Sequence, residues 1–345
     1  MERPRLRGLK SFFGQANKSQ PEQSPSPLAK DSQEPPARAA SDRSEQPSAH
    51  AQVQANHQRH HDEQPQEQAV KKPTGQLALT FFGVSDPGLK RPNNEDHFIV
   101  ADLTRQEIAV EDNVMVPESV HQSIGAKGIL LAVADGLGGH DDGEIASHIA
   151  VEAIAQTLFA LHQEEMSAAE LLTFATHEAH NAICRYTATI PGSRSMSSTL
   201  TAMHIDQGMI TIAQVGDSRA YLFSNGTLTQ LTEDQTIVQM MLKKGMLTDE
   251  EAQNHPDQHV ILQALGQGRA VSPEVTNATI GYDDCVLLCS DGLSSYIDHQ
   301  DIENMLNEET GEQARCDRLL EAAYAAGGED NVTILLARFQ LKPSA

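Results

Sequence analysis

Acidic side chains stand beside small residues at the ends of several apolar runs in this sequence. Three pairs have this placement: Asp135-Gly136, Asp217-Ser218 and Asp291-Gly292. Two further clusters adjoin strand-like segments, Asn94-Glu95-Asp96 and Glu329-Asp330-Asn331. One Asp-Gly pair alone is typical of a turn. Strand ends of a layered sheet meet at one edge, however, and carboxylates gathered there repel one another unless cations neutralise them.

The donor atoms in these clusters indicate which cations would bind. Oxygen ligands favour hard divalent ions such as Mg²⁺ or Mn²⁺, whereas zinc would require His or Cys at ligand spacing, and neither recurs in that way. Two such ions about 4 Å apart can bridge a water, lower its pKa and direct it at a phosphorus atom. Arg91, four residues before Glu95, is placed to hold phosphoryl oxygens through charge-assisted hydrogen bonds.

The elements that must position these clusters follow from apolar patterning. We expect strands at Leu77–Val84, from Phe98, and at Gly128–Ala134, Ser198–Ile205, Met209–Val215, Arg219–Ser224, Asp284–Ser290 and Asn331–Phe339. We expect helices at Ile145–Leu161, Ala168–Ala188, Gln235–Lys244, Asp249–Asn254, Asp301–Leu306 and Gln313–Ala326. Because the strands follow in hairpin order and the helices come in pairs, the pattern favours an α+β layered sandwich over a repeating βαβ sheet.

Two segments do not fit this regular pattern. Residues 101–127 are interpreted as a long polar connection between two strands, longer than a hairpin needs. Residues 235–260 carry several methionines and a Lys243-Lys244 pair. This second segment either contacts a protein substrate or forms an amphipathic helix packed on the sandwich.

Composition divides the chain at about residue 75. Residues 1–75 are rich in Gln, Pro, Ser, Glu and His and poor in aliphatic side chains, so we predict a disordered tail. The region 76–341 is predicted to be a single folded domain. The whole chain has a net charge of −23, and the tail holds 11 basic and 9 acidic residues, which leaves the remainder at −25. Such an acidic domain argues against nucleic acid or an anionic membrane surface as partner.

The cysteines and the hydropathy indicate the compartment. None of Cys184, Cys285, Cys289 and Cys316 forms a CxxC pair, and free structural thiols fit a reducing cytoplasm. No signal peptide is visible, and apolar runs such as Gly128–Ala134 are too short to span a bilayer. We therefore predict a cytoplasmic protein without stable membrane insertion.

Five motifs, taken in order, resemble the PPM/PP2C protein phosphatases, in particular their bacterial members. They are Arg91–Asp96, Asp135–His140, Gly216–Arg219, Ser290–Leu293 and Glu329–Asn331. The resemblance covers residues 77–340 and implies a four-layer αββα sandwich of two mostly antiparallel sheets flanked by paired helices. It also implies hydrolysis of phosphoserine and phosphothreonine on proteins by a water bridging two Mn²⁺ or Mg²⁺ ions. The expected partners are phosphorylated proteins, including a cognate Ser/Thr kinase and its targets.

The resemblance implies a metal-binding role for each matching residue. Asp135 would bridge both ions and take part in catalysis. Asp291 and Asp330 would hold the first ion with it. Glu95 and the carbonyl group of Gly136 would serve the second ion, partly through water.

The remaining matches imply supporting roles. Asp217 would belong to a third, weaker metal position shared with Asp291. Arg91 would bind the substrate phosphate and act in catalysis. Asp96 and Asn331 would not be firm ligands themselves but would hold the metal ligands in position.

The sequence departs from the family pattern outside this predicted metal set. Leu137 stands where eukaryotic relatives often place a histidine that can act as general acid. Ser197 replaces a glycine in the segment Met196–Thr199, and the segment Leu231–Thr236 also differs. These departures bear more on substrate preference and on the conformation of residues 235–260, which correspond to the family's variable flap region, than on catalysis.

Two alternative functions remain open from the sequence. A regulatory pseudophosphatase or phospho-binding module would usually lack some metal carboxylates, yet every predicted ligand is present. A metal phosphohydrolase for nucleotides or small metabolites is less favoured, because Gly136–Gly139 is not followed by the Lys-Ser/Thr of a P-loop.

Overall fold

A computed structural model describes residues 77–112, 119–138, 141–161, 163–190, 196–253 and 255–341. The chain divides into two units, Met1–Ala69 and Val70–Ala345, and all described residues belong to the second. The segment predicted as a disordered tail lies outside the described residues.

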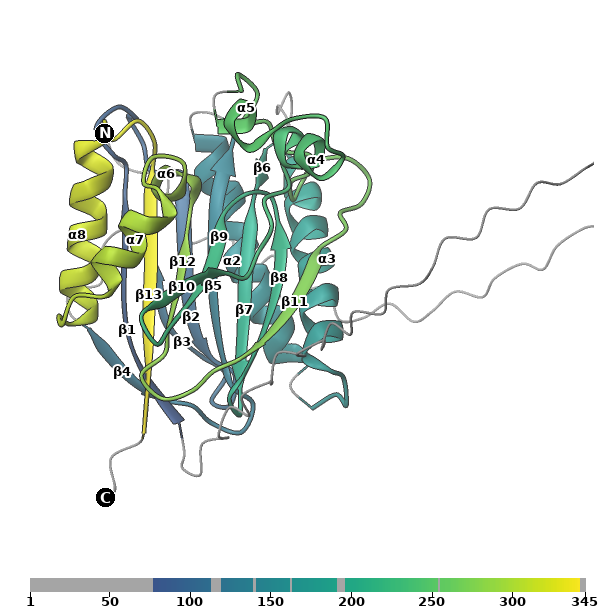
Figure 1. The fold of residues 1–345 in the computed structure, drawn as a ribbon. Helices are drawn as coiled ribbons and strands as arrows, with labels where there is room; N and C mark the ends of the chain where they lie inside the picture. The colour runs from purple at the N-terminus through teal and green to yellow at the C-terminus, as the bar shows by residue number, and fades with distance from the viewer. Residues whose placement is uncertain are drawn as a thin grey trace, which may run out of the picture. The chain divides into compact units, whose positions relative to one another are not determined.

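Two antiparallel sheets form the centre of this unit (Figure 1). The first sheet has the order β10-β9-β12-β13-β1-β4, and the second has the order β11-β8-β7-β5-β2-β3, with β6 paired to β5. The strands of the first sheet are β1 (Leu77–Asp86), β4 (Val120–Ser123), β9 (Arg219–Ser224), β10 (Thr227–Gln230), β12 (Cys285–Cys289) and β13 (Val332–Leu341). Those of the second are β2 (Asp96–Asp102), β3 (Glu107–Asp112), β5 (Ile129–Leu137), β6 (Ser197–Ser198), β7 (Leu200–Asp206), β8 (Met209–Val215) and β11 (Glu274–Thr279).

Helix pairs cover the two outer faces (Figure 1). α2 (Asp141–Ala160) and α3 (Ala168–Thr187) pack on the second sheet, while α7 (His299–Leu306) and α8 (Glu312–Ala325) lie on the first. Shorter helices are α4 (Ile237–Lys243), α5 (Asp249–Gln253) and α6 (Asp291–Ser294). The predicted α+β, four-layer αββα sandwich is therefore confirmed.

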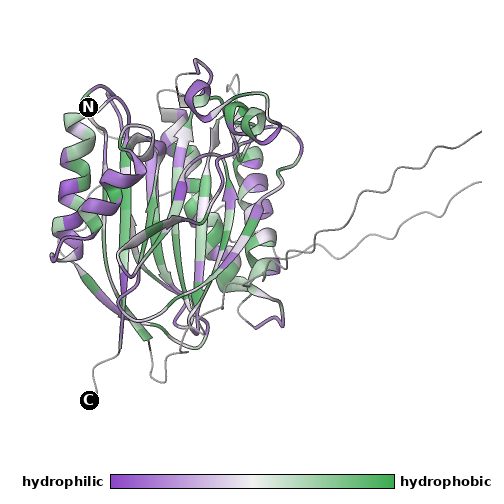
Figure 2. Ribbon diagram, viewed as in Figure 1, coloured by the Kyte–Doolittle hydropathy of each residue, from purple (hydrophilic) through white to green (hydrophobic). Residues whose placement is uncertain are grey.

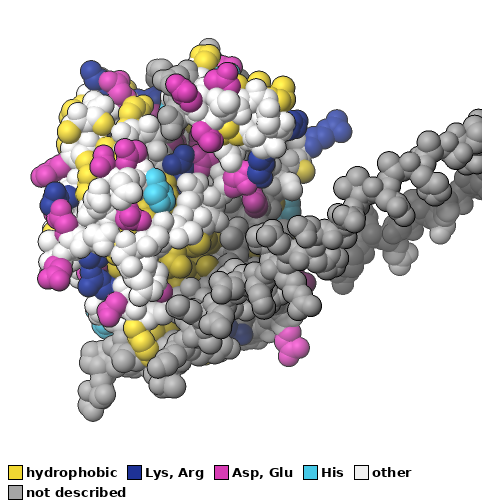
Figure 3. All heavy atoms as spheres, viewed as in Figure 1, with side chains coloured by type: hydrophobic (Ala, Val, Ile, Leu, Met, Phe, Trp, Pro, Cys, Tyr) yellow, Lys and Arg dark blue, Asp and Glu magenta, His cyan; other side chains and the backbone are white. Residues whose placement is uncertain are grey.

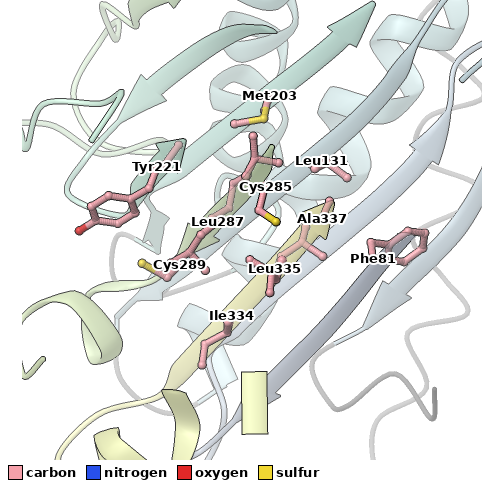
Figure 4. Close-up of a cluster of buried hydrophobic side chains, with 14 of the residues drawn as sticks. Phe81, Leu131, Met203, Tyr221, Cys285, Leu287, Cys289, Ile334, Leu335 and Ala337 are labelled. Carbon is pink, nitrogen blue, oxygen red and sulfur yellow. The ribbon is translucent and has the colours of Figure 1, made fainter. Parts of the chain in front are cut away.

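The hydrophobic core fills the space between the sheets. Figure 4 shows side chains from both sheets meeting there, among them Phe81, Leu131, Met203, Leu335 and Ala337, and each is buried. Burying each large side chain of this kind stabilises the fold by about 1.5–3 kcal/mol. Figure 2 shows the strands as largely hydrophobic, while hydrophilic residues lie on the helices.

A glycine allows the sheets to approach closely near the site. A Cβ atom at Gly83 in β1 would lie 2.6 Å from the Phe98 ring in β2, so a larger residue would push the ring out of its position. Both residues lie close to the predicted clusters in sequence. The close packing at this point fixes the start of β2 against the end of β1.

The interpretation of residues 101–127 as a single long polar connection between two strands was wrong. This stretch contains β3 and β4, which pair with β2 and β1 at the edges of different sheets. Edge strands are often polar, and this concealed them in the sequence. β10 and β11 were also missed, and β11 too is an edge strand whose residues are half-buried or exposed.

Candidate metal centre

The predicted acidic residues come to one end of the sandwich. Asp96 begins β2 and lies directly opposite Asp135 of β5 in the strand register. Asp291 begins α6 two positions beyond the end of β12, and Asp330 lies two positions before the start of β13. Asp217 lies in the turn between β8 and β9. Five carboxylates from separate segments therefore meet near α6 and β6, which lie at the same end of the sheets in Figure 1.

Mutual repulsion in this cluster shows in the pKa values. Burial, and then the charges of neighbouring carboxylates, raises the pKa of Asp135 well above its usual range; these neighbours are Asp96, Asp291, Asp217 and Asp330. Burial raises the pKa of Asp96 to about 7 and that of Asp217 to about 8, with nearby acids adding to both shifts. A raised pKa shows that the ionised form of a carboxyl group is destabilised. Positive charge would therefore be needed to stabilise this cluster with all of its carboxylates ionised.

The backbone of Asp135 is held from both sides by the segment around β6. The Asp135 amide donates to Thr199 Oγ1 at 2.9 Å, while the Thr199 amide and Ser198 Oγ donate to the Asp135 carbonyl at 2.8 and 3.0 Å. Thr199 Oγ1 also lies 2.7 Å from Ser218 Oγ, beside Asp217. The segment that departs from the family pattern thus supports Asp135 directly and joins it to the Asp217 turn.

Asn331 holds the loop that carries Glu95. Its Oδ1 accepts a hydrogen bond from the Glu95 amide at 2.8 Å, and its Nδ2 donates to the carbonyl groups of Pro87 and Asn93 at 3.0 and 2.9 Å. Asn331 itself is buried. Because Asp330 is its neighbour in sequence, this residue couples the position of Glu95 to that of Asp330.

Two glycines allow three backbone segments to meet beside Glu95. A Cβ atom at Gly136 would lie 2.1 Å from the carbonyl oxygen of Gly143 and 2.5 Å from that of Glu95. A Cβ atom at Gly143, in the first turn of α2, would lie 2.2 Å from Glu95 Oε2. The Glu95 carboxylate therefore lies against the start of α2, and neither glycine can carry a side chain without a backbone shift.

Asp96 is a fully buried carboxylate with one satisfied oxygen. Thr333 Oγ1 donates to its Oδ2 at 2.7 Å, and Ser85 Oγ lies 2.7 Å from the same threonine oxygen. The other oxygen, Oδ1, has no hydrogen-bond partner among the described residues. A buried unpartnered acceptor is costly, and here it fits water or a cation in the cluster.

Arg91 lies at the solvent side of the cluster. Its Nη2 donates to Asp330 Oδ2 at 2.7 Å, and its side chain is 55% exposed. The charges of Glu95 and Asp135 also act on this guanidinium. Arg91, which bonds to Asp330 and whose charge also acts on Asp291, is thus a basic side chain of this cluster that is accessible from solvent.

The donor set fits hard divalent cations. All six predicted ligands offer oxygen atoms: five are carboxylates, and the sixth is the carbonyl group of Gly136. Within the part of the chain that the structure describes, no three acidic, histidine or cysteine side chains converge tightly enough to define an ion position by themselves. The fit to cations therefore rests on the donor chemistry, the mutual repulsion and the unpartnered oxygen of Asp96.

A family model described as Protein phosphatase 2C matches residues 115–336. The chain belongs to the protein phosphatase 2C family. The serine/threonine protein phosphatase PstP of Mycobacterium tuberculosis is 36% identical over 264 residues, which are 76% of this chain and 45% of PstP. The chain thus spans about half the length of that relative. The serine/threonine phosphatase stp of Listeria monocytogenes is 35% identical over 216 residues, covering 61% of this chain and 85% of stp.

Solved structures of this phosphatase family have the same architecture. A crystal structure of M. tuberculosis PstP/Ppp aligns with a TM-score of 0.63 and 33% identity, covering 76% of this chain and 99% of that one. The PstP catalytic domain in complex with two manganese ions aligns with a TM-score of 0.60 and 32% identity, over 76% of this chain and 99% of that one.

A contact of this phosphatase 2C domain that was not predicted joins His259 to Asp291. His259 Nδ1 lies 3.8 Å from Asp291 Oδ2, and the histidine side chain is 46% exposed. His259 belongs to the segment 235–260, which the sequence left between a substrate contact and a packed helix. No spacing rule could have found it, because the segment returns to the site only through its pairing with residues 235–237.

Proposed function

We propose that this protein is an active, metal-dependent phosphatase that hydrolyses phosphoserine and phosphothreonine in proteins. The observation that carries the proposal is the cluster of buried carboxylates at one sheet edge, with Arg91 on its solvent side. Membership of the phosphatase 2C family and the names of the relatives support the same reaction. A pseudophosphatase is less favoured, because the cluster retains all of its acidic members.

Divalent Mn²⁺ or Mg²⁺ ions would be held by the residues that the fold brings together. In our proposal Asp135 would contribute to both core positions, Asp291 and Asp330 would serve the first, and Glu95 and the Gly136 carbonyl would serve the second. When bound, such ions would supply Lewis acidity that lowers the pKa of an attacking water. A third, weaker position at Asp217 and Asp291 is supported by the charge interaction between these two carboxylates.

The chain's own residues bind and orient the substrate. Arg91 has several N–H donors and can hold the phosphoryl oxygens in a bidentate fashion on the exposed side of the cluster. To do so it exchanges its ion pair with Asp330 for the phosphate group. Asp96 can accept a hydrogen bond from a water through its buried Oδ1, and this orients that water within the cluster.

The partners we propose are phosphorylated proteins, including a Ser/Thr kinase whose phosphorylation this protein reverses. Figure 3 shows acidic side chains spread over the visible face, with basic ones standing singly or in small groups among them. No described helix is both long and apolar enough to cross a membrane. We further propose a cytoplasmic location, which the four free cysteine thiols support.

The test is hydrolysis of a phosphothreonine peptide by the purified full chain. We expect phosphate release with Mn²⁺, its loss on addition of EDTA, and an inactive Asp135→Asn variant. The matched control is Asp283→Asn, because Asp283 is an exposed residue at φ 62°, a conformation that asparagine tolerates. Full activity in the Asp135→Asn variant, or activity that persists in EDTA, would overturn the proposal.

A further inference from the structure

Ser147 is a fully buried serine in α2 that the proposed reaction does not use. Its Oγ lies 2.5 Å from the carbonyl oxygen of Glu95 and 3.2 Å from the carbonyl oxygens of both Gly143 and Glu144. A hydroxyl group has one hydrogen to donate, and the shortest contact takes it. Helix α2 is therefore bonded through this serine to the backbone of Glu95.

His97 stands behind Ser147 in the same network. Its Nδ1 lies 3.0 Å from Ser147 Oγ, and the ring is buried. Because the serine hydrogen goes to Glu95, the histidine nitrogen must be the donor, which assigns a hydrogen to Nδ1. The His148 ring packs edge-on at a centroid distance of 5.3 Å and restricts the orientation of His97. The order of donation is thus His97 to Ser147 to Glu95.

The Glu95 peptide groups are held on both sides. The carbonyl group accepts from Ser147 and also from the Gly136 amide at 3.1 Å, while the Glu95 amide donates to Asn331 Oδ1 at 2.8 Å. The peptide that contains the Glu95 carbonyl also carries Asp96. A rotation of that peptide would therefore move two carboxylates of the cluster, one against the start of α2 and one buried between the sheets.

We propose that Ser147 is a positioning residue for the metal centre. With His97 behind it, Ser147 fixes the Glu95–Asp96 peptide and thereby directs the Glu95 carboxylate toward the second ion. The inference rests on the proposed function. Residues that orient metal ligands typically change metal affinity or activity by 10–100-fold when they are removed.

A buried helix hydroxyl can also have a purely local role. Thr176 in α3 is such a case, since it is fully buried and donates to the Leu172 carbonyl, one turn back, at 2.8 Å. Ser147 differs because its shortest contact leaves the helix and reaches Glu95. Thr176 therefore provides a matched control for the loss of one buried hydroxyl group.

The experiment compares Ser147→Ala with Thr176→Val in the full chain. Calorimetry measures Mn²⁺ binding, and thermal melting measures Tm. The values of kcat and KM are determined with a phosphothreonine peptide. We expect Ser147→Ala to raise the Mn²⁺ concentration at half-saturation by about tenfold or more and to lower kcat. The KM for the peptide should change little. Thr176→Val should leave Mn²⁺ affinity and kcat as in the wild type, whatever its effect on Tm.

A second pair keeps the test decisive if Ser147→Ala does not fold. His97→Asn retains an N–H donor near the Nδ1 position, whereas His97→Leu removes it, so only the leucine variant should lose Mn²⁺ affinity. Equal Mn²⁺ affinity in Ser147→Ala and Thr176→Val, or in the two His97 variants, would overturn the inference about Ser147. The proposed function would still stand in that case if the wild type binds Mn²⁺. A wild type that neither binds Mn²⁺ nor hydrolyses the peptide would overturn both.

Discussion

Gly136→Ala is a small change with a large effect expected from the structure. The added Cβ atom would lie 2.1 Å from the carbonyl oxygen of Gly143 and 2.5 Å from that of Glu95. Both obstacles are backbone atoms in packed elements, so relief requires a backbone shift of about 1 Å. Overpacking of this kind costs about 1–3 kcal/mol, and we expect the upper end because no flexible side chain can yield.

The magnitude can be converted into two measurable quantities. For a domain of this size, about 3 kcal/mol corresponds to a fall in Tm of roughly 6–12 °C. A displacement of about 1 Å at a catalytic centre can reduce the rate by about 100-fold. We therefore expect a lower Tm and, at a temperature where the variant is still folded, a loss of phosphatase activity near that size.

The assay combines thermal melting with phosphothreonine-peptide hydrolysis at a fixed, saturating Mn²⁺ concentration. Gly281→Ala is the control, since a Cβ atom there would meet nothing closer than 3.4 Å. We expect the control to change Tm and activity little. A Gly136→Ala variant that matched this control in both measurements would refute the close approach of Gly136, Gly143 and Glu95.

Three further predictions concern the same centre. Arg91→Ala should lower kcat/KM for a phosphopeptide by about 10–100-fold, because a charge-assisted hydrogen bond contributes about 1.5–3 kcal/mol; unchanged peptide kinetics would exclude Arg91 from phosphate binding. Asn331→Ala should destabilise the fold by about 3 kcal/mol in denaturant unfolding, because it leaves the Glu95 amide and the Pro87 and Asn93 carbonyl groups without their partner; a loss below 0.5 kcal/mol, on the order of an ordinary surface change, would contradict this. In EDTA, stability should fall as pH rises from the ordinary aspartate pKa of 3.8 toward about 8, since burial raises the pKa of Asp96 to about 7 and that of Asp217 to about 8. Over that window the folded state binds more protons than the unfolded state, so proton release destabilises it. Burial also lowers the pKa of His97 to about 3, which opposes this trend below pH 6.5, so Tm measured from pH 6.5 to 8 checks the sign, and Tm rising over that range would contradict it.

Much of the frame could be predicted because the buried strands are continuous apolar runs. β5 and β12 are buried along most of their length; Asp135 lies near the end of β5, and Asp291 follows β12 after Ser290. Their placement at one end of the sheets follows from strand geometry, and this is why Asp135 and Asp291 could be expected to meet. The paired helices α2 and α3 could likewise be predicted from the spacing of their apolar residues.

The rest depended on contacts that local sequence does not encode. β3 and β4 are polar edge strands, so burial leaves little trace of them in the sequence. His259 reaches Asp291 only because the segment after α5 folds back over the site. No motif or spacing marks Ser147 in the sequence, and its bond to Glu95 arises from the packing of α2 on β2.

The central claim is that this carboxylate cluster is a divalent-metal centre. Anomalous diffraction at the manganese edge, from crystals of the protein grown with Mn²⁺, tests it most directly. We predict at least two peaks within ligand distance of the cluster, with Asp135 contacting both and Glu95 and Asp330 contacting one each. Manganese peaks only elsewhere on the protein, or a cluster without peaks at saturating Mn²⁺, would contradict the account.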